Sequence, residues 1–178
     1  MALKHFGKPE NDEGTWFKFD SPTGAFELRV RRLSPGVSEK IDARHKGKSH
    51  FEVIEGIRRP IRDLEAITDG LAEKAAWCLT DARGLKIEIA DPEGLAFWKN
   101  ATKVEALEVG AEVEIVGDVL SHEVKMLLIR ELRPFCPMPS RDDPTKIDEV
   151  EIGMFIIRKA GDLQRGHAKD QGEQAGNS

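Results

Sequence analysis

The chain has 178 residues, a third of them charged, and a formal net charge of −5, so it is long enough for one ordinary domain and as a whole repels nucleic acid weakly. It contains no tyrosine and few other aromatic residues, which argues against a base-stacking platform, so we expect no nucleic-acid partner. Cys78 and Cys136 match neither a disulfide framework nor a metal-ligand spacing, and no apolar run reaches the length of a signal peptide or a membrane span, so we expect a cytoplasmic protein with no membrane partner.

Residues 1–13 are polar, and we expect them to form a loose leader. The next segment, up to residue 32, has the alternation of apolar and polar residues that is typical of two half-buried strands. Between its two runs, residues 20–24 contain a proline and a glycine, which predicts a five-residue hairpin loop. The alternating apolar residues are Phe17, Phe19, Phe26, Leu28 and Val30.

A change to helical spacing follows the hairpin. Ser34 and Pro35 read as the N-cap and first residue of a short helix that ends near residue 46 in a basic stretch. Residues 51–55 alternate again and predict a strand. From residue 61 to residue 80, apolar residues recur every three or four positions and predict a helix with one buried face. They are Ile61, Leu64, Ile67, Leu71, Ala75 and Cys78.

The pattern continues with a turn at residues 81–84, a strand at 85–89, a helix that starts at Asp91-Pro92, and a strand within 109–116. Ser121 then caps an amphipathic helix that Pro134 stops near residue 133. Residues 14–133 therefore predict an α+β domain, in which short antiparallel strands pack against amphipathic helices.

The C-terminal part divides into three segments. Residues 134–144 are rich in proline and predict an extended connector. Within residues 145–163 we expect a helix from Ile147 to Leu163, which can lie apart from the main domain or fold back on it. Residues 164–178 lack the apolar side chains needed to order a segment, so we expect a flexible, disordered tail.

No motif with the spacing of a catalytic or cofactor site is present. The five histidines occur in no recognisable motif, and the glycines form neither a dinucleotide fingerprint nor a phosphate-binding loop, so we expect no cofactor, no metal and no catalytic residues. Carboxylates at 142–143 and 148–151 favour a solvated helix start, with an unrecognised enzyme site as the alternative. Arginines at 29–32 and 58–62 favour a charged strand edge, with phosphate binding as the alternative.

An apolar surplus near the C-terminus is the one feature that indicates a binding surface. The connector holds exposed-looking apolar residues, and the following helix has apolar residues around more of its circumference than one core face needs. Burial in the protein's own core is the alternative. The candidate partner-binding residues are Phe135, Met138, Met154, Phe155 and Ile157.

Four loose patterns carry a resemblance: W-F-x-F at Trp16–Phe19, F-x-x-R-x-R-x-L-S-P at Phe26–Pro35, A-W-x-L-x-D-x-x-G-L at Ala76–Leu85, and E-V-K-x-x-L at Glu123–Leu128. Together they cover most of residues 14–133. In them the chain resembles the tail assembly chaperones of long-tailed bacteriophages and prophages.

Such proteins are not enzymes. The resemblance implies that the chain acts in the bacterial host cell, binds the long apolar tape-measure protein, keeps it soluble, and helps to recruit tail-tube subunits. A structural subunit of the tail or connector is the alternative function. An enzyme with an unrecognised carboxylate site is a further alternative.

Overall fold

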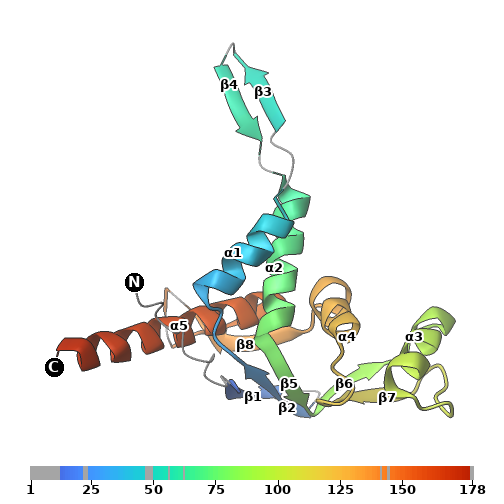
Figure 1. Cartoon of the computed structure of the whole chain (residues 1–178). Coiled ribbons are helices and arrows are strands. Elements are labelled where there is room, and N and C mark those ends of the chain that lie inside the picture. The colour runs from blue at the N-terminus through green and yellow to red at the C-terminus, as the bar shows by residue number, and fades with distance from the viewer. Residues whose placement is uncertain are drawn as a thin grey trace, which may run out of the picture.

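The computed structural model describes residues 13–21, 24–46, 50–55, 57–61, 63–140, 142–143 and 145–176 (Figure 1). The fold is α+β, with short antiparallel strands in small sheets packed against helices, so the predicted fold class is confirmed. The predicted leader lies outside the described residues apart from its last residue, Glu13, whose carboxylate forms an ion pair with Arg29 at 2.7 Å.

A three-stranded antiparallel sheet in the order β1-β2-β5 forms one side of the core. It contains β1 (Thr15–Ser21), β2 (Gly24–Val30) and β5 (Leu79–Arg83). The predicted hairpin is present, and its register places Phe19 opposite Phe26 and Ser21 opposite Gly24. The loop is shorter than the predicted five residues, because pairing continues until only residues 22 and 23 separate the strands.

The middle of the chain contains a hairpin of which the sequence analysis found only one strand. After α1 (Pro35–Arg44), β3 (His50–Ile54) pairs with β4 (Ile57–Ile61) and with no other strand of the described residues. We call the hairpin His50–Ile61 the arm; it extends away from the body (Figure 1). Our prediction of a helix from residue 61 was wrong, because Ile61 satisfies the spacing of both a strand and a helix.

Helix α2 (Leu64–Cys78) begins where Asp63 caps it, with the Asp63 carboxylate accepting a hydrogen bond from the Ala66 amide at 3.0 Å. It ends earlier than predicted, and Leu79 enters β5 directly. The predicted turn at 81–84 is therefore mostly strand. Buried Leu79 and Ala82 explain the difference, since the sheet takes them into the core as its third strand.

Residues 85–133 follow the predicted order. Strand β6 (Leu85–Glu88) pairs antiparallel with β7 (Glu112–Ile115), and α3 (Pro92–Thr102) lies between them in the chain. The predicted caps are present: Asp91 accepts a hydrogen bond from the Gly94 amide at 2.7 Å, and Ser121 accepts one from the Val124 amide at 3.3 Å. The Ser121 cap lies at the start of helix α4 (His122–Leu127), which continues as a π-helical turn, η1 (Leu128–Leu132).

The proline-rich segment is the first strand of a hairpin and not an extended connector. Strand β8 (Phe135–Pro139) pairs antiparallel with β9 (Ile147–Glu151), and helix α5 (Ile152–Gly176) follows at once. The predicted helix start at Ile147 is wrong by five residues. Burial of Cys136 and Met138 explains the strand, because these residues alternate with Pro137 and Pro139 and face the core.

The same helix extends to Gly176, beyond the predicted end at Leu163, through the segment that we expected to be disordered. Among the α5 side chains that the structure describes, the buried ones lie between Ile152 and Ala160. From residue 161 to residue 169 the side chains are exposed or half-buried, as in a helix that leaves the body (Figure 1).

The first turns of α5 complete the hydrophobic core. The Phe155 ring lies edge-to-face on Phe19, with centroids 4.7 Å apart, and on Phe17 at 5.7 Å. Ile152 and Ile156 are fully buried beside it. Full burial of such side chains stabilises the fold by about 1.5–3 kcal/mol each. Thus this part of the helix folds back on the domain.

We therefore predict that truncation after Asp143 abolishes cooperative unfolding, because it removes β9 and every buried residue of α5. Truncation after Leu163 is the matched control, since it keeps all of those residues and should lower the melting temperature little. Thermal unfolding followed by circular dichroism measures both. A cooperative transition in the shorter chain would show that α5 is not part of the core.

Candidate functional site

One face of α2 belongs to the core over only half of its length. Leu64, Ile67, Leu71, Ala75 and Cys78 follow helical spacing on a single face, as the sequence predicted. Ala75 and Cys78, in the C-terminal half, are at most 1% exposed. Leu64, Ile67 and Leu71, in the N-terminal half, are 72%, 44% and 43% exposed. We call these three residues the α2 stripe; it is a core-type face that nothing covers in the described structure.

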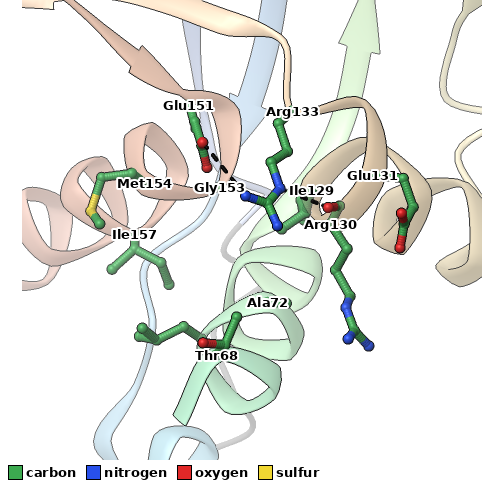
Figure 2. A pocket seen from close by; sticks show the side chains of 11 residues that line it. Thr68, Ala72, Ile129, Arg130, Glu131, Arg133, Glu151, Gly153, Met154 and Ile157 are labelled. Atoms are coloured by element: carbon green, nitrogen blue, oxygen red, sulfur yellow. Dashed lines mark hydrogen bonds and ion pairs between the residues drawn. The ribbon is translucent and has the colours of Figure 1, made fainter. Parts of the chain in front are cut away.

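The stripe leads into a groove between α2, η1 and the start of α5 (Figure 2). The groove has a volume of about 300 Å³. Leu71 belongs to both the stripe and the groove, and Met154, which is 47% exposed, stands on the opposite wall. The lining residues are Thr68, Leu71, Ala72, Ile129, Arg130, Glu131, Arg133, Glu151, Gly153, Met154 and Ile157.

Two backbone features determine how closely the walls of the groove approach each other. Gly153 allows α5 to approach η1, because a Cβ added at this position would lie 2.9 Å from Cγ2 of Ile129. The π-helical turn ends with the Arg133 amide donating to the Leu128 carbonyl at 2.9 Å, five residues back. Arg133 itself has a left-handed backbone with φ of 42°. Such π-turns concentrate at functional sites in proteins.

Ion pairs bind the rim of the groove together. Arg130 contacts the Asp69 carboxylate of α2 at 2.9 Å, and Arg133 contacts Glu151 of β9 at 3.7 Å. The Arg133 Nε also donates to the Arg130 carbonyl at 2.7 Å (Figure 2). All four side chains are partly exposed, so the pairs hold the rim's geometry more than they stabilise the fold. The result is an apolar floor inside a polar rim of mixed charge.

The structure separates the five residues that we predicted to bind a partner. Met154 and Ile157 line the groove, and Phe135 is 58% exposed on β8. Met138 and Phe155 are buried in the core and face no solvent in this conformation. The helical spacing alone could not assign them, because α5 is apolar around more than one face and only contact with Phe17 and Phe19 decides which face turns inward.

Most of the groove residues were not predicted to lie at a binding site. Leu71 was interpreted as core, since its spacing matches Ala75 and Cys78, and no pattern marks where the body stops covering the face. The π-turn residues were read as an ordinary amphipathic helix. The one available signal was the size of the side chains on this face of α2, which are large at Leu64, Ile67 and Leu71 and small at Ala75 and Cys78.

The acidic segments make no metal site of the usual kind. Within the residues that the structure describes, no three His, Cys, Asp or Glu side chains are placed to hold an ion. Asp148, Glu149 and Glu151 lie on β9 and not at a helix start, contrary to our prediction. Hydrogen bonds from the Thr145 hydroxyl and amide lower the pKa of Asp143, which shapes the turn before β9.

Arg31, which directly follows β2, has partners within the fold. The Arg31 guanidinium lies 3.5 Å from the centroid of the Trp77 ring and donates to the Trp77 carbonyl at 2.8 Å. Partial burial, and secondarily the charge of Arg31, lowers the pKa of Lys125. The side chains of the arginines at 58, 59 and 62 lie outside the described residues.

The chain matches no protein-family model, no curated protein and no solved structure. In the described ranges, none of the helices combines the length and the apolar character that crossing a bilayer would require.

The tight approach at Gly153 predicts that Gly153→Ala destabilises the fold by about 1–3 kcal/mol, since the new methyl group must displace the Ile129 side chain. Gly166→Ala, in the same helix, is the control. No atom lies within 4 Å of its added Cβ, so the higher helix propensity of alanine should leave stability unchanged or slightly raised. Urea unfolding measures the pair, and equal effects would contradict the close contact.

The two cysteines should be chemically inert in the folded protein. Both are fully buried, and burial raises the pKa of the Cys136 thiol to about 12. A thiol that is protonated and shielded cannot act as a nucleophile. We expect a thiol reagent at pH 8 to label neither cysteine until denaturant is added, and rapid labelling of the native protein would contradict the buried positions.

Proposed function

We propose that the protein is a non-enzymatic tail assembly chaperone that binds an apolar helical segment of the tape-measure protein along the α2 stripe and in the adjoining groove. The observation that carries the proposal is the half-covered face of α2: residues with core spacing and core size continue past the end of the core. The family assignment itself rests on the sequence resemblance described above.

The energetic argument favours a binding surface. Each large apolar side chain that leaves water stabilises a complex by roughly 1.5–3 kcal/mol when fully buried. Leu64, Ile67 and Leu71 together offer several kcal/mol, from which the cost of association must be subtracted. Such a surface fits a weak or transient complex, which suits a chaperone that must release its client.

The shape of the site favours a helix as the client segment. The stripe residues are spaced i, i+3 and i+7, which gives two helical turns of contact along a length of about 10 Å. Met154 on the opposite wall is flexible and adapts to side chains of different shape. The charged rim of Arg130, Glu131 and Arg133 keeps the surroundings hydrated, so that only the apolar strip attracts the client.

A structural subunit of the tail remains the second candidate. It would keep its apolar face covered permanently by neighbouring subunits, whereas a chaperone exchanges between free and client-bound forms. Two of the groove's lining residues, Glu131 and Glu151, are acidic, and Glu151 forms an ion pair with Arg133 at 3.7 Å.

The test is co-expression with a tape-measure fragment that contains a long apolar helix. Ile67→Lys and Leu71→Lys should each reduce the amount of soluble, co-purified fragment several-fold, because a charge cannot be buried there without large cost. Their melting temperatures should stay near that of the wild type, since both side chains are already exposed.

Val104→Lys and Val109→Lys are the matched controls. These valines are as exposed as Ile67 but lie outside both the stripe and the groove, so their substitution should leave co-purification unchanged. If all four variants reduce co-purification equally, or if none does, the α2 stripe is not the client site.

A further inference from the structure

The hydrogen bonds at the two ends of the β8–β9 hairpin determine which of its backbone groups point outward. The Ser140 amide donates to the Lys146 carbonyl at 2.9 Å, and the Ile152 amide donates to the Pro134 carbonyl at 2.8 Å. In an antiparallel pair, hydrogen-bonded and non-hydrogen-bonded residue pairs alternate. The even-numbered residues of both strands therefore bond across the hairpin, and the odd-numbered residues direct their N–H and C=O groups to the outer edges.

The two outer edges differ, because only the edge of β8 is blocked by proline. Pro137 and Pro139 occupy outward-facing positions, so this edge lacks two of the donors that a further strand would need. The residues opposite them on β9, Glu149 and Ile147, keep their N–H groups. In the described part of the chain, β9 pairs with β8 alone, and no hydrogen bond occupies the backbone groups of Ile147 and Glu149. The outer edge of β9 is therefore open to strand addition.

The open edge is also exposed and acidic. Strand β9 contains Asp148, Glu149 and Glu151 and no basic residue, which gives it a net charge of −3. Glu151 forms an ion pair with Arg133 at 3.7 Å, whereas Asp148 and Glu149 are exposed and form no ion pair within the described ranges. Successive side chains of a strand point to opposite faces. A strand added at this edge would therefore meet a carboxylate on each of its two faces.

Apolar side chains lie on the outer face of the same hairpin. Ile147 and Phe135 share this face with Glu149, and they are 63% and 58% exposed. Cys136 and Met138 take the inner face and are buried in the core, so they hold the hairpin on the body. The edge thus combines free backbone groups with acidic and apolar side chains on a supported strand.

We propose that the outer edge of β9 binds an extended, basic segment of a partner protein by strand addition. The backbone of the segment completes the hydrogen bonds of Ile147 and Glu149, and its Lys or Arg side chains lie opposite Asp148 and Glu149. The charge of the edge favours this occupant, because an acidic strand is repelled and a neutral strand leaves two carboxylates without partners. The site is separate from the groove that favours a helix, and the inference does not depend on the chaperone function.

The experiment measures binding of a designed peptide to the full-length protein by fluorescence anisotropy. The probe is fluorescein-labelled TKVKKVT, in which KVKKV runs antiparallel to β9 and places lysine opposite Asp148, Glu149 and Glu151. Binding should be saturable and roughly tenfold weaker at high salt, because ions screen the contact. A second probe is N-methylated at the lysine opposite Glu149. It keeps every charge and loses one donor of the ladder, so it should bind roughly tenfold more weakly than the first.

Reversing the charge of the edge should reverse its preference. Asp148→Lys with Glu149→Lys should weaken binding of TKVKKVT at least roughly tenfold. The same variant should bind TKVEEVT, in which only the two residues that face the reversed side chains are changed. A gain of binding by the acidic peptide cannot result from loss of folding.

Glu149→Pro tests the backbone donor from the side of the protein. Glu149→Gln is the matched control, since it removes the same charge and keeps the N–H group. The proline variant should bind TKVKKVT several-fold more weakly than the glutamine variant. Both variants should melt near the wild-type temperature, because the Glu149 N–H makes no bond within the hairpin.

Three results would overturn the proposal: no saturable binding of TKVKKVT, equal binding of its N-methylated form, or a reversed edge that still prefers the basic peptide. The first result would show that the acidic residues only protect the edge from other strands. Two other occupants would also contradict it. If the peptide binds only after deletion of residues 1–12, the chain's own leader fills the edge. If Glu149→Pro abolishes a self-association seen by sedimentation velocity, a second copy fills it.

Discussion

The contact of Phe155 with Phe17 and Phe19 is the interaction on which the rest of the structure depends. It joins the last helix of the chain to its first hairpin, with ring centroids 4.7 Å apart for the closer pair. Once α5 is fixed there, its first turns also pack against α2 and supply one wall of the groove.

This arrangement gives α2 two roles along one face. Toward Cys78 the side chains are small, which allows close packing of neighbouring elements, and toward Leu64 they are large and exposed. The arm leaves the body at the exposed end of the helix (Figure 1). The groove lies beside the transition between the two halves, because Leu71 and Ala72 line it.

Local signals in the sequence predicted most of the elements. The caps at Asp91 and Ser121 and the presence of the first hairpin depend on near neighbours, so the residues themselves specify them. Strands β4, β5, β8 and β9 were missed, since their pairing partners are what make them strands. Pro60 and Pro137 both disfavour a strand on local grounds, yet each lies in a hairpin.

The candidate site was harder to predict for the same reason. The spacing of apolar residues placed Leu64, Ile67 and Leu71 correctly on one helical face with Ala75 and Cys78. Whether each of these side chains is exposed depends on tertiary contacts, which the spacing does not specify. Likewise, Met154 and Phe155 are adjacent in the sequence and apolar, and only the packing of α5 places one on the groove and the other in the core. The groove could be inferred only once the positions of three separate segments were known.

Amide hydrogen exchange along α2 tests most directly the claim that one helix face is half core and half binding surface. In the free protein, amides from residue 72 to residue 78 should exchange only through global unfolding, and those from residue 64 to residue 71 should exchange faster through local opening. On addition of a tape-measure fragment, protection should rise in the N-terminal half alone. Uniform protection of the free helix, or no change in residues 64–71 with the fragment bound, would contradict the account.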